Sequence, residues 1–245
     1  MDLSLLSLQK SDVMTNNTIY SARMKLADMI LADANLLPIL ERLNIRLGFG
    51  DTNVKEVCQR YGLSADLFLI ICNIYSFETY VPHIDALTKK DIGKILAYLR
   101  TSHEYYTKVC FPHLHENIHR MMESCDALNN KIINKFYDDY DNEVNNHFEY
   151  EEKVAFPYVE SLLAGKRDLA SDYNIAQFEC NHSNIDEKLN DLKNIIIKYL
   201  PDSCSSAMNY EVLSDIFHIE KDLRKHTLIE NKLLIPLVSK LEHDE

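Results

Sequence analysis

Apolar side chains recur at steps of three and four from residue 88 onward, the spacing that places them on one face of an α-helix. Loop-favouring stretches interrupt this pattern at residues 124–126, 165–172 and 201–206. The pattern therefore predicts four long helical segments, over residues 89–123, 127–163, 172–200 and 208–242. Four long helices joined by short connections are typical of an antiparallel up-down-up-down bundle.

The first 85 residues show shorter helical signals. They predict helices over residues 25–33, 35–43, 54–61 and 64–75, with Thr52 and Ser64 as N-caps. Another capping signal, Thr88 followed by Asp91, opens the first long segment. We therefore expect two domains, a small helical one over 1–85 and a four-helix bundle over 86–245.

Composition supports an all-α fold. The chain has only 5 Gly and 6 Pro in 245 residues, about 2% each against averages of roughly 7% and 5%. Sandwiches, barrels and Rossmann sheets need a turn every ten or so residues, which this chain cannot supply. Pro112, Pro157 and Pro236 fall inside the helical patterns, and each should kink or loosen its helix.

Charge and hydropathy argue against several partners. The formal net charge is -12, so neither nucleic acid nor an anionic membrane surface should attract the chain. The most apolar stretch, residues 67–75, is about half the length that a bilayer requires, and we expect no signal peptide. The six cysteines form no C-x-x-C pair, which favours free buried thiols in a reducing cytosol. We therefore predict a cytoplasmic location.

Each long segment interrupts its apolar face with a histidine, and two of the segments add a glutamate four residues later. A buried carboxylate without a partner costs several kcal/mol, and no Lys or Arg lies on these faces to compensate it. Imidazoles and carboxylates converging from four helices would instead hold two metal ions, with each Glu reaching between them. The expected ligands are His103, His147, Glu151, His182, His226 and Glu230.

Chance accounts poorly for this arrangement. A single core histidine is most simply a hydrogen-bonded structural residue, but four at matching positions are hard to explain in that way. A third His-x-x-x-Glu pair, His119 and Glu123, lies off the apolar face, and we expect it to be exposed to solvent. His113 is a reserve ligand, whereas His115 should lie at the surface. Motifs for zinc proteases, phosphate loops, dinucleotide binding and elbow serines are absent.

The helix bearing His147 resembles a known family. Its run His-Phe-Glu-Tyr-Glu-Glu-Lys-Val-Ala-Phe-Pro-Tyr is similar to the signature helix of hemerythrin-like bundles, in which His and Glu ligands precede Phe-Pro. The other three helices resemble that family through Ser102-His103 with Phe111-Pro112, Asn181-His182, and His226 to Glu230 with the following Leu-Ile-Pro236. The recurring prolines are then a family feature.

Residues 25–58 add a second likeness, to the small helical domain that precedes the bundle in iron–sulfur cluster repair di-iron proteins. Together the two likenesses span residues 22 to 241. They imply an oxo- or hydroxo-bridged pair of iron ions held by four His and two bridging Glu, binding O2 or NO. They further imply a role in nitrosative or oxidative stress, with damaged iron–sulfur proteins as partners. Where that family carries an adjacent Cys-Cys pair, this chain has Gly48-Phe49, so thiol-dependent steps lose their support.

Two other functions stay open at this level. The bundle could sense O2 or NO and signal through residues 1–85, or it could simply store oxygen or iron. Residues 54–68 superficially resemble a helix-turn-helix. Residues 1–85 hold 7 basic and 10 acidic side chains, however, so their net charge of -3 opposes DNA binding. We expect a metal-binding repair or sensing protein rather than a classical enzyme, and a homodimeric assembly is left open.

Overall fold

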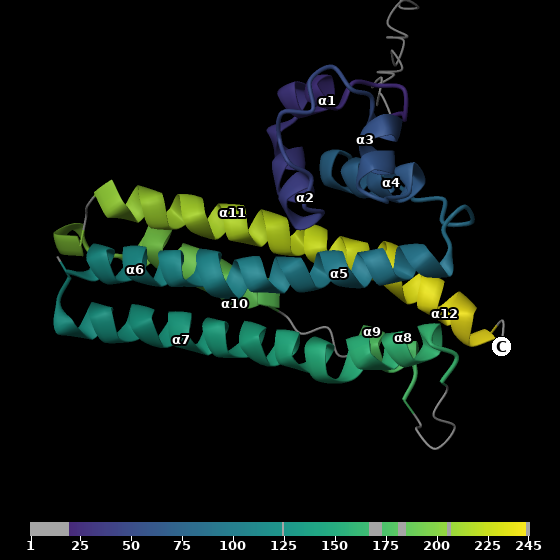
Figure 1. The fold of residues 1–245 in the computed structure, drawn as a ribbon. Coiled ribbons are helices and arrows are strands. Elements are labelled where there is room, and N and C mark those ends of the chain that lie inside the picture. The colour runs from purple at the N-terminus through teal and green to yellow at the C-terminus, as the bar shows by residue number, and fades with distance from the viewer. Residues whose placement is uncertain (1–19, 124, 167–172, 181–184, 205–206, 244–245) are drawn as a thin grey trace, which may run out of the picture.

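The computed structural model describes residues 20–123, 125–166, 173–180, 185–204 and 207–243. These residues form helices, loops and one isolated β-bridge, between Lys25 and Asn53. The predicted all-α fold is confirmed: long helices lie side by side in a bundle, and a group of short helices packs against one side of it (Figure 1).

Paired helices make up the bundle. They are α5 (Lys89–Tyr105) and α6 (Phe111–Met122), α7 (Ala127–Tyr150) and α8 (Phe156–Leu163), α9 (Ile175–Cys180) and α10 (Ile185–Asn194), and α11 (Ala207–Ile229) and α12 (Ile235–His243). A π-helical turn joins the two helices of the first, second and fourth pairs. The short helices are α1 (Leu26–Ala32), α2 (Leu37–Arg42), α3 (Val54–Arg60) and α4 (Ala65–Ser76).

Capping residues explain where several helices begin. The Ser64 hydroxyl accepts a hydrogen bond from the backbone N–H of Leu67, as predicted. The Asp91 carboxylate accepts one from the backbone N–H of Thr88, which starts α5. The helix over residues 54–61 begins at Val54 as predicted, but its cap at Thr52 is wrong, because the Asn53 side chain is the N-cap of α3 and accepts a hydrogen bond from the backbone N–H of Glu56. Asparagine is a better N-cap than threonine, which agrees with this choice.

A π-helical turn precedes each of the three prolines inside the bundle helices. These turns are Tyr106–Cys110, Glu151–Ala155 and Glu230–Leu234. In each, the residue before the proline donates its N–H to the carbonyl five residues earlier instead of four. Proline has no N–H and its ring clashes with the carbonyl four residues back, so the wider turn accommodates it. The predicted loosening of these helices therefore takes the same form three times.

The π turns also shift which residues face inward. Uninterrupted α-helical spacing would place Cys110 and Val154 on the apolar faces, but Cys110 is half-buried and Val154 is exposed. The buried positions are instead Phe111 and Ala155, one residue further along. The same spacing would bury Phe136, which is exposed, whereas Tyr137 is buried.

Two groups of buried apolar side chains fill the interior. The first joins the short helices to the end of the bundle formed by α8 and α12, through residues such as Leu36, Phe156 and Val238. The second fills the other end, around residues such as Tyr140 and Ile216. The polar site described below lies where the two groups meet.

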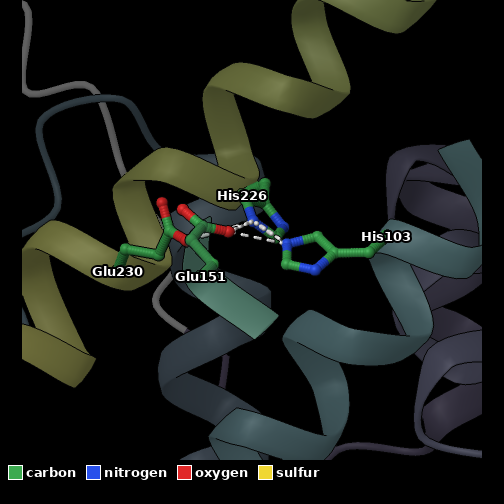
Figure 2. A group of neighbouring side chains, drawn as sticks. All are labelled: His103, Glu151, His226 and Glu230. Carbon is green, nitrogen blue, oxygen red and sulfur yellow. Dashed lines mark hydrogen bonds and ion pairs between the residues drawn. The ribbon is translucent and has the colours of Figure 1, made fainter. Parts of the chain in front are cut away.

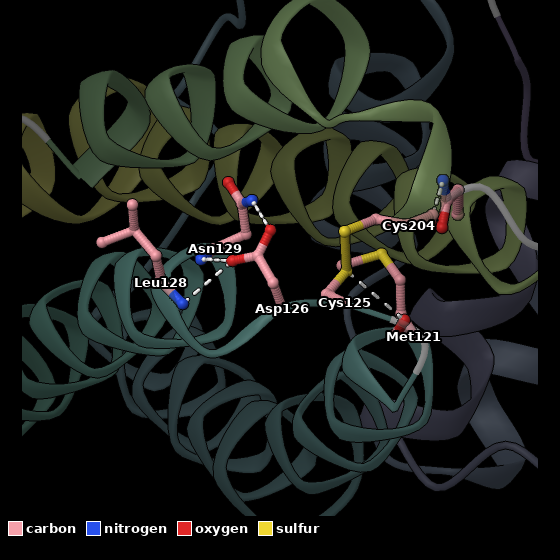
Figure 3. The surroundings of a disulfide bond; sticks show 7 residues. Met121, Cys125, Asp126, Leu128, Asn129 and Cys204 are labelled. Atoms are coloured by element: carbon pink, nitrogen blue, oxygen red, sulfur yellow. Dashed lines mark hydrogen bonds between the residues drawn. A yellow bond between two sulfur atoms is a disulfide. The ribbon is translucent and has the colours of Figure 1, made fainter.

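Cys125 and Cys204 form a disulfide bond, with their Cα atoms 4.6 Å apart (Figure 3). It joins the corner between α6 and α7 to the segment that leads into α11. The expectation of free thiols is therefore wrong for this pair. The two cysteines are 79 residues apart in the sequence, so no local pattern indicates their pairing. Cys58, Cys72 and Cys110 are free thiols, the first two buried.

Candidate metal centre

Four of the predicted ligands converge in the interior (Figure 2). His103 lies near the end of α5, and His226 near the end of α11. Glu151 and Glu230 each begin a π turn. All four side chains are buried, both glutamates completely, and one ligand atom from each lies within 4.8 Å of the others. Such a cluster of imidazole nitrogens and carboxylate oxygens suits a cation.

His147 completes the group on the α7 side. Its Nε2 atom lies 2.9 Å from Oε1 of Glu151, one helical turn further along, and its side chain is 8% exposed. Five of the six predicted ligands therefore lie together. The sixth, His182, lies outside the described residues.

The prolines set the position of both glutamates. Glu151 and Glu230 are each six residues before a proline, and the carbonyl of each accepts the N–H of the residue just before that proline. The His four residues earlier shares the face of each Glu. The π turns thus give two different helices the same local geometry at the site.

The contacts of Glu151 show why a cation fits here. Its Oε2 atom lies 2.9 Å from Nε2 of His103 and 4.0 Å from Nε2 of His226, and its Oε1 atom faces His147. Although these atoms are close, neither oxygen makes a hydrogen bond of good geometry with the residues that the structure describes. Buried carboxylate oxygens normally have hydrogen-bond partners, so their placement is better suited to metal ligation than to hydrogen bonding.

The second carboxylate repeats this arrangement. His226 Nε2 lies 3.1 Å from Oε1 of Glu230. The same nitrogen is only 3.2 Å from Nε2 of His103, so two imidazole nitrogens point at one another. Two imidazole nitrogens this close together, beside two buried carboxylates, suit a site that holds a positive charge between them.

Electrostatics also favours positive charge at this point. Burial alone raises the pKa of Glu151, but the close imidazoles of His103, His147 and His226 outweigh it and hold that pKa well below its usual range. Burial lowers the pKa of His226, yet Glu230 and Glu151 raise it to about 9. Without a metal, the site therefore attracts protons, which a bound cation would replace.

Glu152 supports His103 from outside the cluster. Its Oε1 atom lies 2.8 Å from Nδ1 of His103, and Arg100 donates a hydrogen bond to its Oε2 atom at 3.0 Å. This contact orients the imidazole so that Nε2 faces the centre. The ring also stacks between Phe148 and Phe156, at centroid distances of 4.2 and 5.5 Å. Sequence reasoning missed Glu152, because its position beside Glu151 places it off the apolar face.

The other histidines stay away from the centre. The reserve ligand His113 is exposed and pairs with Asn117 and Asp215. His115 stacks on Tyr137, and His119 is exposed. His83, His218 and His243 are exposed as well.

A buried polar network flanks the centre and was not predicted. Arg42 of α2 is 3% exposed and binds the carboxylate of Asp222 on α11. Tyr106 donates a hydrogen bond to the same carboxylate at 2.9 Å, and its ring packs edge-on against His226. Asp222 was not among the predicted site residues. Its position four residues before His226 was the available signal, since residues at that spacing share a helix face.

A comparison with known families agrees with this geometry. The family profile described as the hemerythrin HHE cation binding domain matches residues 94–238. The chain belongs to this family. The hemerythrin-like assignment is therefore confirmed, and the matched region contains every predicted ligand. No curated protein matches the chain. Among the described residues, no helix of this hemerythrin-like protein combines the length and apolarity that crossing a membrane would require.

Proposed function

We propose that this hemerythrin-like protein binds a pair of iron ions in the bundle and uses them in the repair of damaged iron–sulfur clusters. The ligands would be His103, His147, Glu151, His182, His226 and Glu230, with the two glutamates between the metals. Membership of a cation-binding family supports metal binding. The mixed imidazole and carboxylate donors support a borderline metal such as iron.

The observation that carries the proposal is the placement of Glu151. Its two buried oxygens face imidazoles that come from three different helices, and no hydrogen bond of good geometry from the described part of the chain satisfies them. A carboxylate in this position can join two metals held roughly 3.5–4 Å apart. When bound, the iron pair would supply redox chemistry and an open position for O2 or NO. The protein's own residues hold its ligands in place and exclude water.

Metal analysis of the purified protein tests the binding step. We expect about two irons per chain, as in a binuclear site, and absorption bands typical of a bridged ferric pair. A matched comparison is Glu151→Gln against Glu149→Gln, because Glu149 is exposed on the same helix. Loss of iron in the first variant alone supports the assignment. A protein that binds no iron under reducing, iron-rich conditions contradicts it.

The repair role needs a separate experiment. Iron-loaded protein should restore activity to aconitase whose cluster has been damaged by nitric oxide, and iron should move from one protein to the other. A Glu230→Gln variant, stripped of metal, should be inactive in this assay. Tight iron binding without transfer would point to storage instead. The Gly48-Phe49 sequence means that such transfer would proceed without a Cys-Cys pair in this segment.

Sensing is a second candidate because the short helices are linked to the centre. Arg42 of α2 binds Asp222, Asp222 accepts a hydrogen bond from Tyr106, and Tyr106 contacts His226. A change at the metal could therefore reach the short helices through three contacts. Hydrogen exchange of α1–α4 with and without nitric oxide tests this idea. Altered protection there that disappears in Arg42→Met would favour sensing, and unchanged protection would count against it.

A further inference from the structure

Asp222 collects hydrogen bonds from two buried tyrosines. Tyr106 donates to its Oδ2 atom at 2.9 Å, and Tyr75 donates to its Oδ1 atom at 3.1 Å. Tyr98 donates in turn to the Tyr75 hydroxyl at 2.8 Å. Arg42 binds the same carboxylate. The ion pair between Arg42 and Asp222 alone would be enough to attach α2 to the bundle. The three phenols are therefore not needed for docking and are available for redox chemistry.

One end of this tyrosine cluster touches the metal centre. The Tyr106 ring meets the His226 ring edge-on, with centroids 5.9 Å apart. The Tyr106 ring also lies 5.8 Å from the ring of Phe148, and Phe148 stacks on His103. Tyr106 is therefore in contact with one expected metal ligand and a single ring away from another.

The other end of the cluster reaches the surface. Tyr75 and Asp222 line a cleft of about 320 Å³ between the short helices and α11. Tyr105 and the free thiol of Cys110 line the same cleft. A small molecule in the cleft would lie next to Tyr75, while Tyr106 stays fully buried. The phenols thus form a continuous path from the cleft to the metal centre.

We propose that Tyr106 and Tyr75 carry electrons from this cleft to the metal centre, so that the protein reduces hydrogen peroxide. The proposal rests on the proposed function, because it needs a redox-active metal pair.

The balanced step consumes one peroxide and two phenols and yields two water molecules and two tyrosyl radicals. The O–O bond breaks, and the peroxide gains two electrons and two protons. A small one-electron reductant in the cleft, such as ascorbate, then restores each phenol by supplying one electron and one proton.

Asp222 has the right geometry to move the protons. A tyrosine releases its proton when it loses an electron, and a base within hydrogen-bond distance makes that release easier. Each phenol has one oxygen of Asp222 in that position.

Electron paramagnetic resonance of the iron-loaded full-length protein tests the proposal. After treatment with hydrogen peroxide and rapid freezing, we expect an organic radical signal that narrows when the protein contains ring-deuterated tyrosine. Tyr106→Phe removes one hydroxyl and keeps the ring, and it should lose most of the signal. Tyr158→Phe is the matched control, because the Tyr158 hydroxyl contacts Glu242 rather than the cluster. The control should keep the signal.

Further measurements separate the possible failures. Iron content and the absorption spectrum are recorded first, so a protein without iron counts against the proposed function. An iron-loaded protein that gives no radical, or the same radical in Tyr106→Phe, overturns the tyrosine proposal alone. Peptide mapping of the peroxide-treated natural protein needs no variant: oxidation should appear on Tyr106 and Tyr75 before Tyr158, and the reverse order would contradict the proposal. Ascorbate-dependent peroxide consumption should fall in Tyr75→Phe.

Discussion

Tyr106 and Glu151 occupy equivalent positions on two different helices. Each is the first residue of a π turn and lies six residues before a proline, Pro112 and Pro157 respectively. The turn in α11 and α12 places Glu230 in the same way before Pro236. The fold therefore supplies the same backbone position three times, with carboxylates at two and a phenol at the third. This phenol faces away, toward Asp222, and connects the centre with the short helices.

The first prediction concerns the carboxylate between the imidazoles. Glu151→Ala should lose most of the bound metal while the bundle stays folded but less stable. The reason is that three imidazoles lose the negative charge that they share. His119→Ala is the control, because His119 is exposed and its Glu123 partner lies on the outer face. Metal analysis and circular dichroism measure both effects. A large loss of metal in the control would mean that the wrong pair on this helix was assigned.

Glu152 gives a prediction about affinity rather than occupancy. Glu152→Gln keeps the size of the side chain but removes the charge that orients His103 through Nδ1. Loss of such an outer carboxylate typically weakens metal binding by about 10- to 100-fold. Competition with a chelator of known affinity measures the change. Glu149→Gln, on the exposed side of α7, should leave the affinity unchanged. Equal affinities in both variants would show that Phe148 and Phe156 alone position the ring.

The sequence predicted the bundle and most of the centre for one reason. Both depend on the spacing of residues along single helices, as with His147 and Glu151. The register beyond each proline could not be predicted in this way. A π turn inserts one residue, so Phe111 and Ala155 became buried instead of their neighbours. Spacing on one helix shows where a face is interrupted but not how wide the next turn will be.

Long-range pairs were missed for a different reason. Arg42 and Asp222 are 180 residues apart, and each looks like an ordinary surface charge in its own helix. Their burial follows from the docking of the short helices on α5 and α11, which no local pattern encodes. Cys125 and Cys204 present the same difficulty, because a disulfide depends on how two loops meet in space. Features that depend on residue spacing within one helix could thus be predicted. Pairs of residues from two different elements became visible only in the structure.

The pKa of His226 predicts a pH dependence for the metal-free protein. It rises from 6.5 in the unfolded chain to about 9 in the folded one, because Glu230 and Glu151 favour the charged imidazole. This contribution to stability, about 3 kcal/mol, should be fully present below pH 6.5 and disappear as the pH rises through 9. Urea unfolding with a chelator present, at pH 6 and pH 10, measures it. His226→Gln should lose much of this dependence, while the exposed His243→Gln should keep it.

The last prediction concerns the disulfide at the end of the bundle. The bond between Cys125 and Cys204 closes a separation of 79 residues, which in the chain-entropy view contributes about 4 kcal/mol of stability by restricting the unfolded chain. A reducing agent should therefore lower the urea midpoint of the natural protein. Cys125→Ser should show the lower midpoint from the outset and respond no further to reduction. Cys110→Ala, which removes a free, half-buried thiol, should still respond. If reduction leaves the natural protein's midpoint unchanged, the bond does not stabilise this corner, and packing of α6 against α11 holds it instead.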